Sequence, residues 1–298
     1  MAEILVGVDS SAVAQRALQR AAIEAESAGS ALHVVHAWTT PVWLGGIAGL
    51  GYNVLASPAE SRQWATTVLD KQLADARENH PSIIPTNSET IEGDAKHVLV
   101  EHSSGASLLV LGGHGDGKVK GLLLGSATSY VLHHAQCPVM VVPDVGSDTT
   151  TLQRVIVGVD GSPASRSALR WGLAAARRHS CPLIALHAWL LTSAPGGPPL
   201  RHLAPEEEYQ AQAQAWLDEE IAQTVPDTLG VEVRAELVRS TASWALLDKA
   251  GPDDLLVVGA RGKGGFAELL LGSVADQCAQ HARGLFVVVR ADEERLGS

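Results

Sequence analysis

The sequence predicts an α/β fold built as two tandem, open, doubly wound sheets of parallel strands. Three observations lead to this prediction. Short apolar runs alternate with helical patterns along the 298 residues, several of these runs are unbroken stretches of Val, Leu and Ile, and the first half of the chain recurs in the second. Unbroken apolar strands are typical of parallel sheets that helices cover on both faces, and alternating strands and helices with right-handed crossovers build such sheets.

The individual elements follow from apolar periodicity and from capping residues. In the first half we expect five strands, at Glu3–Val8, Ala31–Ala37, Ser82–Ile91, Ser107–Gly112 and Val139–Val142. Between them we expect four helices, at Ala12–Ala28, Pro58–Asn79, Asp94–His102 and Ser126–Ala135. Side-chain oxygens that can accept hydrogen bonds from a first helical turn make three residues the expected N-caps, namely Ser10, Asp94 and Ser126.

An internal repeat defines the domain organisation. The recurring pairs are ILVGVD at Ile4–Asp9 and VIVGVD at Val155–Asp160, HAW at His36–Trp38 and His187–Trp189, and LLLGS at Leu122–Ser126 and Leu269–Ser273. The first two pairs are separated by 151 residues and the third by 147. The difference falls in Gly/Pro-rich loops, where changes of length are tolerated. Because Asp144–Gln153 is polar and lacks periodicity, we expect it to link one domain at residues 1–146 to another at 153–292.

Composition and charge exclude several classes of protein. The formal net charge is −11, and an acidic chain lacks the basic face that sequence-independent binding to nucleic acid or anionic lipid needs. Cys137, Cys181 and Cys278 lie far apart, so neither a disulfide framework nor a structural zinc site is expected. No apolar run approaches the length of a membrane span, and the expected location is the cytoplasm.

The candidate site follows from the expected topology. In a doubly wound sheet, ligands bind beyond the carboxyl ends of the strands, where the strand order reverses. The loops after strands one, two and four are therefore candidates, and they contain Asp9, Ala37-Trp38 and the segment Gly112–Ser126, GGHGDGKVKGLLLGS.

Two familiar phosphate-binding motifs do not account for this segment. It nearly matches the P-loop pattern GxxxxGK[ST], but Val119 stands where a hydroxyl would bind magnesium. The second copy also has Gly265 in place of Lys118. Neither copy has GxGxxG after its first strand, as a dinucleotide-binding fold would.

Both copies do share the pattern Gly-x2-Gly-x9-Gly-Ser. Its members are Gly112, Gly115, Gly125 and Ser126 in the first copy and Gly259, Gly262, Gly272 and Ser273 in the second. Glycines at a strand exit can adopt positive φ and let main-chain N–H groups approach an anion, and Gly-Ser before an apolar helix offers amides at the helix N-terminus. The alternative is that the glycines only make turns and the serine only caps a helix.

With these residues the chain resembles a tandem protein of the universal stress protein family. The resemblance rests on ILVGVDSSAVAQRAL and VIVGVDGSPASRSAL, the HAW triplets, both glycine–serine segments and CPVMVV at Cys137–Val142. It covers the chain except for the linker and the C-terminal tail. It implies adenine nucleotide alpha hydrolase-like domains whose five parallel strands have the order 3-2-1-4-5. For members with this glycine pattern it implies ATP binding, with or without Mg²⁺.

The resemblance also implies roles for individual residues. Asp9 and Asp160 would contact the nucleoside, the main chain at Ala37 and Ala188 would meet adenine, and the glycine–serine segments would hold ribose and phosphates. The complete set of expected nucleotide-binding residues is Gly7, Val8, Asp9, Ala37, Gly112, His114, Gly115, Gly125, Ser126, Ala127 and Thr128, with Gly158, Val159, Asp160, Ala188, Gly259, Arg261, Gly262, Gly272, Ser273 and Val274 in the second copy. For the two aspartates a helix cap is a second explanation, and it is compatible with ligand contact.

The two copies differ near this site, so we expect two competent but unequal sites. The differences are Ser10 against Gly161, His114 against Arg261, Thr128 against Ala275, and Cys137-Pro138-Val139 against Gly284-Leu285-Phe286. The last of these leaves open whether the two final strands pair alike.

No catalytic or metal-binding residue is predicted. His114 is a candidate phosphate contact, but Arg261 at the matching position excludes a shared general base. The histidines without the ligand spacing of a metal site, which we interpret as structural, are His33, His36, His133 and His134.

The expected function is that of an ATP-binding regulator of the stress response or growth arrest, with at most weak ATP hydrolysis. A nucleotide-using enzyme on the same fold and a scaffold with vestigial sites are the alternatives. The expected partners are an adenine nucleotide, with ATP and cyclic AMP both open, and a second copy of the chain joined through Val139–Val142, unless the two halves pair with each other. No protein target of the regulator is predicted.

Overall fold

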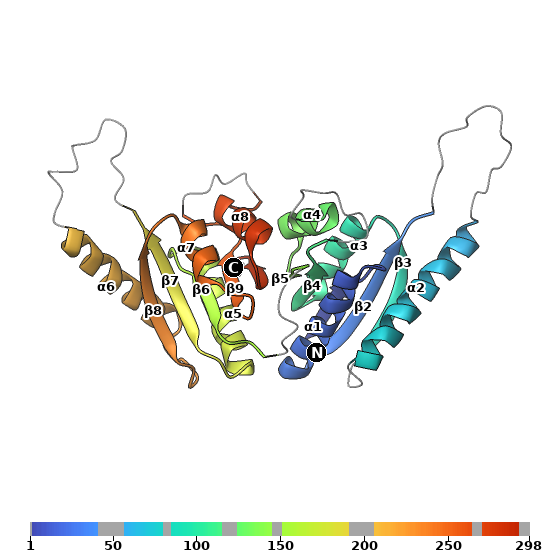
Figure 1. Ribbon diagram of the computed structural model, residues 1–298, viewed down its shortest axis with the longest axis horizontal. Coiled ribbons are helices and arrows are strands. Elements are labelled where there is room, and N and C mark those ends of the chain that lie inside the picture. The colour runs from blue at the N-terminus through green and yellow to red at the C-terminus, as the bar shows by residue number, and fades with distance from the viewer. Residues whose placement is uncertain are drawn as a thin grey trace, which may run out of the picture. The chain divides into compact units, whose positions relative to one another are not determined.

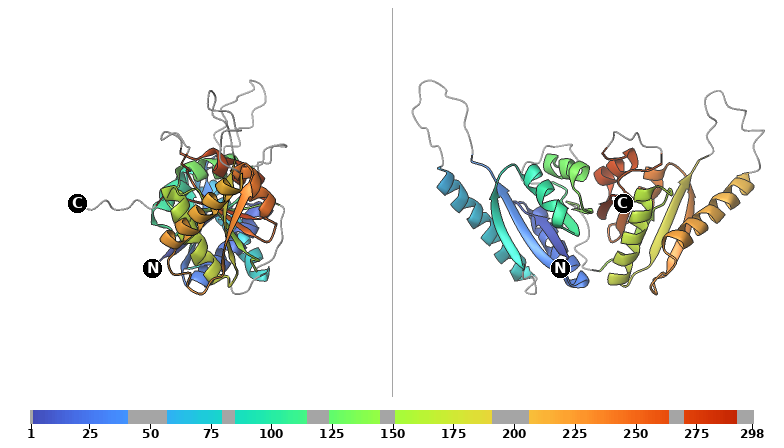
Figure 2. Two further views of the ribbon diagram at one scale, coloured as in Figure 1. Left: turned by 90° about the vertical axis from the view of Figure 1, so that its left-hand side faces the viewer. Right: turned by 180° about the vertical axis from the view of Figure 1, so that it is seen from behind.

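The computed structural model describes residues 2–40, 57–79, 85–114, 124–144, 151–190, 206–263 and 270–291. The chain divides into two compact units, Met1–Asp144 and Val145–Ser298. In each unit, helices lie on both faces of a sheet of parallel strands (Figures 1 and 2). Among the described helices, no stretch has both the length and the apolar character that crossing a membrane requires.

The first unit alternates strands and helices from its first strand to its last. Its elements are β1 (Glu3–Gly7), α1 (Ala12–Ala28), β2 (Ala31–Trp38), α2 (Pro58–Asn79), β3 (Asn87–Glu92), α3 (Ala95–His102), a short 3-10 turn (Ser103–Gly105), β4 (Leu108–Gly112), α4 (Ser126–His134) and β5 (Val139–Val142).

The second unit repeats this succession. Its elements are β6 (Val155–Gly158), α5 (Pro163–Arg178), β7 (Leu183–Trp189), α6 (Glu206–Thr224), β8 (Val233–Arg239), α7 (Ala242–Lys249), β9 (Leu255–Gly259), α8 (Ser273–His281) and β10 (Leu285–Val289).

The strand order confirms the predicted fold class. All described pairings within a unit are parallel, in the order β3-β2-β1-β4-β5 in the first unit and β8-β7-β6-β9-β10 in the second. Helices α1 and α2 pack together over β1 to β3, and α3 and α4 pack together on the opposite face. Both faces are therefore covered, and the central strands β1, β4, β6 and β9 are buried apolar runs, as the sequence pattern predicted.

Local capping agrees with the predicted helices but corrects two of the predicted caps. Ser11, not Ser10, caps α1, because its Oγ accepts a hydrogen bond from the N–H of Ala14 at 3.1 Å. Asp94 caps α3 as predicted. Gly125 occupies the cap position of α4, so Ser126 is the first helical residue and not the cap. In both wrong predictions the cap lies one residue from the expected position.

The predicted third strand begins too early. The strand starts at Asn87 and not at Ser82, while residues 80–84 lie outside the described part of the chain. Among the described residues, Pro85 has no N–H to donate, and the N–H of Thr86 donates to the carbonyl of Leu32 on β2 at 2.8 Å. A proline directly before this bond is consistent with a strand that starts after it.

The two final strands pair alike, which answers the question left open by their different sequences. Val139 lies opposite Leu109 and Phe286 lies opposite Leu256, at equivalent positions of the two units. Gly284 precedes β10 where a Cβ would come within 2.6 to 2.9 Å of three main-chain carbonyl oxygens. Close approach of the chain therefore requires glycine there.

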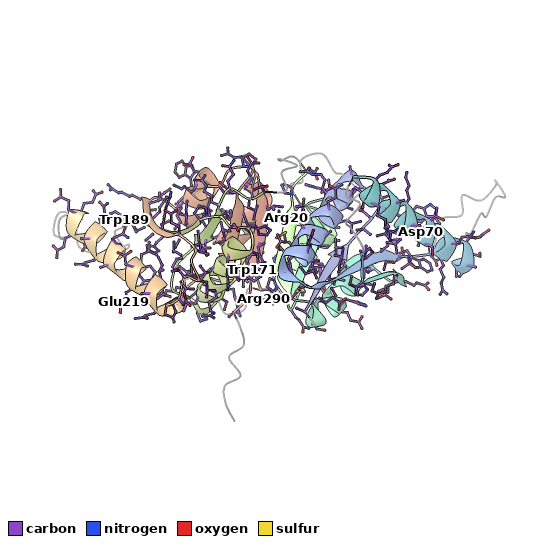
Figure 3. All side chains as sticks on the ribbon, turned by 90° about the horizontal axis from the view of Figure 1, so that it is seen from below. Arg20, Asp70, Trp171, Trp189, Glu219 and Arg290 are labelled. Atoms are coloured by element: carbon purple, nitrogen blue, oxygen red, sulfur yellow. The ribbon has the colours of Figure 1, made fainter. Side chains whose placement is uncertain are left out.

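The first unit also buries one ion pair that its repeat lacks. Arg20, which is labelled in Figure 3, and Glu24 stand one turn apart on α1. Their side chains are hydrogen-bonded to each other and are only 5% and 1% exposed. The second unit has Trp171 and Ala175 at the equivalent positions. Apolar residues occupy these positions in one copy, so the pair is not a requirement of the fold.

Candidate functional site

A pocket lies at the point of topological reversal in each unit. β1 pairs with β2 on one side and β4 on the other, so the connections that leave β1 and β4 pass to opposite faces and open a crevice between them. The same arrangement holds for β6, β7 and β9. The pockets lie at the carboxyl ends of these strands.

A carboxylate and a serine shape the turn after the first strand of each unit. Oδ1 of Asp9 accepts a hydrogen bond from the N–H of Ser11 at 3.0 Å. Oδ1 of Asp160 accepts one from Ser162 at 2.9 Å. Each serine then caps the helix that follows. The aspartates therefore order the turn, and both also line their pockets, so the structural explanation and the binding explanation are compatible.

The difference between Ser10 and Gly161 changes the backbone of this turn. Gly161 has a φ of +73°, which favours glycine, whereas Ser10 is not among the described residues with positive φ. A Cβ on Gly161 would lie 2.8 Å from Nζ of Lys263 and 2.8 Å from Cζ2 of Trp216. The second turn therefore packs under these two side chains more closely than a residue with a Cβ would allow.

A histidine joins the second strand to the same turn. Nδ1 of His36 donates to the carbonyl of Val8 at 2.8 Å, and Nδ1 of His187 donates to the carbonyl of Val159 at 2.7 Å. The alanine that follows each histidine, Ala37 or Ala188, lines the pocket of its unit, and His187 lines the second pocket as well. The HAW triplet thus contributes a small residue to the wall of each pocket.

The glycines at the strand exits do not act through positive φ, contrary to the expectation from sequence. Positive φ occurs at none of the described members of the pattern, which are Gly112, Gly125, Gly259, Gly262 and Gly272. A Cβ on Gly259 would instead lie 2.7 to 2.9 Å from main-chain atoms of Ala164 and Ser165. One on Gly112 would lie 2.8 Å from Cγ1 of Val13. These two glycines let the first helix of each unit approach the sheet.

The second half of the pattern builds a helix N-terminus. Gly125 and Gly272 are the N-caps of α4 and α8, and no side chain caps either helix. Their N–H groups donate to the carbonyls of Gly113 and Ala260 at 2.8 and 2.7 Å, which returns the chain to the strand end. Because a glycine cap has no side-chain acceptor, the N–H groups of the first helical turn remain available to an anion.

The second pocket collects every residue that the sequence predicted for it. Its volume is about 430 Å³. The ten predicted residues that line it are Gly158, Val159, Asp160, Ala188, Gly259, Arg261, Gly262, Gly272, Ser273 and Val274. Sequence reasoning missed Ser162, Ser165, Leu186, His187, Ala242, Leu246, Val258 and Ala275. Of these, Ser162 belongs to the turn that reads VDSS in the first copy and VDGS in the second, and His187 belongs to the repeated HAW triplet, so both motifs could have indicated them.

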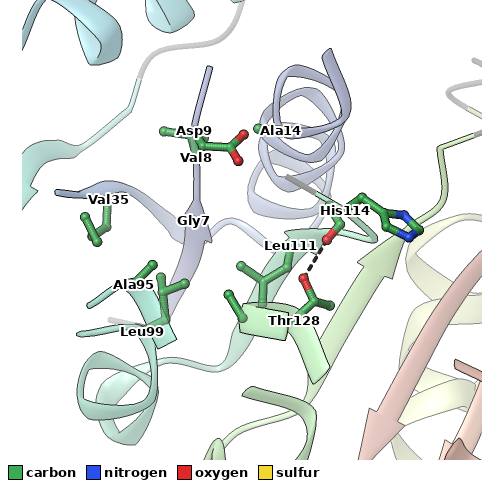
Figure 4. Close-up of a pocket in the computed structure, with 13 residues that line it drawn as sticks. Gly7, Val8, Asp9, Ala14, Val35, Ala95, Leu99, Leu111, His114 and Thr128 are labelled. Carbon is green, nitrogen blue, oxygen red and sulfur yellow. Dashed lines mark hydrogen bonds between the residues drawn. The ribbon is translucent and has the colours of Figure 1, made fainter. Parts of the chain in front are cut away.

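The first pocket is smaller, and eight of the described residues predicted for it line it. Its volume is about 100 Å³ (Figure 4). The predicted residues that line it are Gly7, Val8, Asp9, Ala37, Gly112, His114, Ala127 and Thr128. Gly125 and Ser126 stand at the start of α4 but do not line it, and Gly115 lies outside the described residues. The lining residues that the sequence did not indicate are Ala14, Val35, Ala95, Leu99 and Leu111.

In the second unit the glycine loop is hydrogen-bonded to the turn after β6. Oδ2 of Asp160 accepts from the N–H of Lys263 at 3.0 Å, and Oγ of Ser162 donates to the carbonyl of Arg261 at 3.0 Å. A Cβ on Gly262 would collide with Oδ2 of Asp160. The loop therefore lies against the same carboxylate that lines the pocket.

Helix α6 supports this side of the second pocket. The ring of Trp216 lies 4.6 Å from the ring of His187, and Nζ of Lys263 lies 5.2 Å from the centre of the indole. One turn further, Glu220 accepts from Nε and Nη2 of Arg166 at 2.5 and 3.0 Å. This hydrogen bonding lowers the pKa of Glu220 below its ordinary value, with a smaller contribution in the same direction from Lys263. Glu220 is thus held as a carboxylate near neutral pH.

The rims of the two pockets carry different charge. In the first, Nδ1 of His114 lies 3.5 Å from Oδ1 of Asp144, and both side chains are mostly buried. In the second, Arg261 takes the place of His114, and Ala291 stands where the first copy has Asp144. The second pocket therefore offers a fixed cation where the first has a histidine–carboxylate pair.

The linings of the two pockets have a similar chemical character. They combine main-chain N–H groups, hydroxyls and one carboxylate with apolar walls, as pockets for small polar ligands commonly do. Within the ranges that the structure describes, no three His, Cys, Asp or Glu side chains gather as a metal site would need.

The fold and the pockets define a tandem α/β protein with one pocket at the topological switch point of each unit. A profile of the universal stress protein family matches residues 1–143 and again residues 151–290. The chain therefore belongs to the universal stress protein family.

Similar proteins span the same tandem length. A universal stress protein of Mycobacterium tuberculosis (strain ATCC 25618 / H37Rv) is 34% identical over 300 residues, which covers 96% of both chains. A universal stress protein of Mycolicibacterium smegmatis is 34% identical over 296 residues with the same coverage. The crystal structure of a universal stress protein from Archaeoglobus fulgidus DSM 4304 aligns with a TM-score of 0.66 at 17% identity, covering 97% of this chain and 98% of that one. The last comparison shows a shared fold.

Proposed function

We propose that the chain binds ATP in the pocket of each unit and acts as a nucleotide-dependent regulator of the stress response or growth arrest. Binding, not turnover, would be its activity. The observation that carries this proposal is the second pocket, where all ten residues expected from the sequence line one cavity of about 430 Å³. Pockets for small molecules and cofactors commonly have volumes of roughly 300 to 1,000 Å³.

The arrangement of groups supports a ligand with an apolar end and an anionic end. At the end of β7, Ala188 offers a small apolar surface, which suits the flat face of an adenine. Asp160 lines the same pocket with its carboxylate against the glycine loop, where it could accept hydrogen bonds from ribose hydroxyls. Ser273 and Val274, in the first turn of α8, would direct main-chain N–H groups at the phosphates.

The same groups favour binding over catalysis. Phosphate held by main-chain amides and by Arg261 would need a positioned base to activate a water molecule. The first pocket has His114 at the position of Arg261, and an arginine cannot serve as that base at neutral pH. We therefore propose at most slow ATP hydrolysis.

Regulation would follow from movement of the glycine loop. A ligand that engages Asp160 and Ser162 competes with the hydrogen bonds that these residues make to Lys263 and Arg261. Filling the pocket would therefore reposition the loop, and with it the surface offered to a partner. A homodimer, or pairing of the two halves, remains a prediction, as does a cytoplasmic location.

Calorimetric titration with ATP, ADP, AMP and cyclic AMP tests the proposal, with product analysis after long incubation. We expect saturable binding of an adenine nucleotide and negligible product. Gly262→Leu should abolish binding in the second pocket because its side chain meets the Asp160 carboxylate. Gly105→Leu is the matched control, since a Cβ there meets nothing within 4 Å. Rapid multiple turnover would support an enzyme, and an absence of binding would support vestigial sites.

A further inference from the structure

We propose that the second pocket is the principal ATP site and that two pairs of residues set the difference, Leu111 against Val258 and Thr128 against Ala275. The inference rests on the proposed function and goes beyond it, because it assigns the tighter ATP binding to one unit and names the side chains that weaken ATP binding in the other.

The first pair lies on the floor of each pocket. Leu111 and Val258 are the next-to-last residues of β4 and β9, in the equivalent runs LLVLG and LLVVG. In the first unit, Cδ2 of Leu111 and Cδ2 of Leu99 lie 2.8 and 2.9 Å from the place of a Cβ on Gly7. Both leucine side chains therefore lie beside Gly7 at the end of β1, and both line the pocket drawn in Figure 4. They fill the space where the base and ribose would enter.

The floor of the second pocket is more open. Around the equivalent Gly158, Cδ1 of Leu246 lies at 3.1 Å and Cγ1 of Val258 at 3.7 Å from the place of a Cβ. Valine is one methylene shorter than leucine, and in a packed interior that methylene is space that neighbours do not recover. The shorter side chain leaves the second floor clear.

The second pair lies at the start of the fourth helix of each unit. Oγ1 of Thr128 donates to the carbonyl of Gly112 at 2.8 Å, and the residue is 6% exposed. This bond ties the first turn of α4 to the end of β4. Ala275 is equally buried at 2% exposure, but it has no hydroxyl to make such a bond. Thr128 thus occupies volume and holds helix and strand together on the phosphate side of the first pocket.

The other differences in the lining do not explain the larger second pocket. Leu186 and Val274 replace Val35 and Ala127, and both are larger in the second unit. Total side-chain volume would therefore make the second pocket the smaller one, whereas its cavity is about 430 Å³ against about 100 Å³. We therefore attribute the larger second pocket to Val258 and Ala275, where the second unit has the smaller residue of each pair.

Charge at the rim acts in the same direction. A triphosphate at the first rim would approach the carboxylate of Asp144, 3.5 Å from His114, whereas the second rim presents Arg261. Lys118 and Lys120 of the first glycine segment lie outside the described residues. The test therefore concentrates on the pocket floor.

Reciprocal double substitutions in the full chain test the inference. L111V/T128A opens the first pocket and V258L/A275T narrows the second. By calorimetry with ATP we expect two classes of site in the unsubstituted protein, with dissociation constants about tenfold apart or more. V258L/A275T should weaken the tight class about tenfold, and L111V/T128A should tighten the weak class by a similar factor. Leu109→Val, which removes a methylene from β4 away from the pocket, should leave both affinities unchanged.

Titration with adenosine, which has no phosphates, distinguishes the effect of the pocket floor on affinity from the effect of the charged rim. L111V/T128A should improve the binding of adenosine as well as ATP, because the floor limits space for base and ribose. Asp144→Ala should improve ATP alone.

Each outcome decides between the proposals. Two sites of equal ATP affinity in the unsubstituted chain would overturn this inference and leave the proposed function standing, whereas binding at neither site would overturn the proposed function. Unchanged affinities in both double variants, with thermal melting like that of Leu109→Val, would show that these residues do not set the difference.

Discussion

An alanine at position 259 would force β9 and helix α5 apart. The added Cβ would lie 2.7 Å from the carbonyl carbon of Ala164, 2.8 Å from the nitrogen of Ser165 and 2.9 Å from the carbonyl oxygen of Ala164. All three atoms belong to the main chain of the first turn of α5. A main chain cannot move aside as a side-chain rotamer can, so the helix itself has to shift.

The cost follows from two opposing effects. Overpacking a well-packed interior destabilises by about 1 to 3 kcal/mol, and three main-chain contacts below 3.0 Å put this site at the upper end. Replacing glycine by alanine restricts the unfolded chain, which returns about 0.4 to 1 kcal/mol. The expected net loss is about 2 kcal/mol in the free energy of unfolding. For a unit of this size it lowers the melting temperature by about 4 to 8 °C.

Gly112→Ala is the matched comparison in the first unit. Its Cβ would meet Cγ1 of Val13 at 2.8 Å, but the nearest main-chain atoms lie at 3.3 Å. A valine side chain can yield, so the expected loss is about 1 kcal/mol or less. Urea unfolding followed by circular dichroism measures both variants. The reasoning is refuted if Gly259→Ala is as stable as the unsubstituted protein, or if Gly112→Ala loses as much.

Three further predictions follow from the described contacts. ATP should change the intrinsic fluorescence of Trp216, because the loop that moves carries Lys263 over its ring, and Trp216→Phe should lose that change; an identical signal in the variant would contradict this. Glu220→Gln should lower the free energy of unfolding at pH 7. Because hydrogen bonding to Arg166 lowers the pKa of Glu220, the difference in stability between variant and unsubstituted protein should shrink as the pH falls below 4.5, the ordinary pKa of a glutamate, in urea unfolding at several pH values. A difference that grows in acid would show that the effect has another origin. Thr128→Val should lower the free energy of unfolding by about 1 kcal/mol in urea unfolding, because one buried hydrogen bond is lost. Equal stability of the two proteins would show that this hydrogen bond does not stabilise the fold.

Elements with strong periodicity were predictable, and boundaries set by a single hydrogen bond were not. Helix α1 was expected at Ala12–Ala28 and is found there, because its buried positions recur with helical spacing. Ser10 and Ser11 are both able to cap it, and local sequence does not distinguish them. The turn after β1 determines which serine is the cap, because the Asp9 carboxylate accepts a hydrogen bond from the N–H of Ser11 and so places Ser11 at the cap position.

The position of the second pocket was predictable from the sequence, but the structural role of the glycines at the strand exits was not. The internal repeat located the turn residues and the glycine pattern in both copies, and the second pocket gathers its predicted set. The assumed reason for the glycines at the strand exits was wrong, since Gly112 and Gly259 have ordinary φ. Glycine is required at these two positions because Val13 and Ala164, which lie about a hundred residues earlier in the sequence, pack against them in the folded protein.

The sequence by itself determined the duplication, the doubly wound topology and the strand ends at which the pockets form, because periodicity and repeat spacing are properties of the chain read in order. Only the tertiary structure decided that the pockets differ in size. Leu111 and Val258 look interchangeable in two apolar strands. Their difference matters only where Leu111 and Leu99, from different parts of the chain, both lie against Gly7 at the end of β1. Volume in a packed interior depends on such convergence, and no one segment contains it.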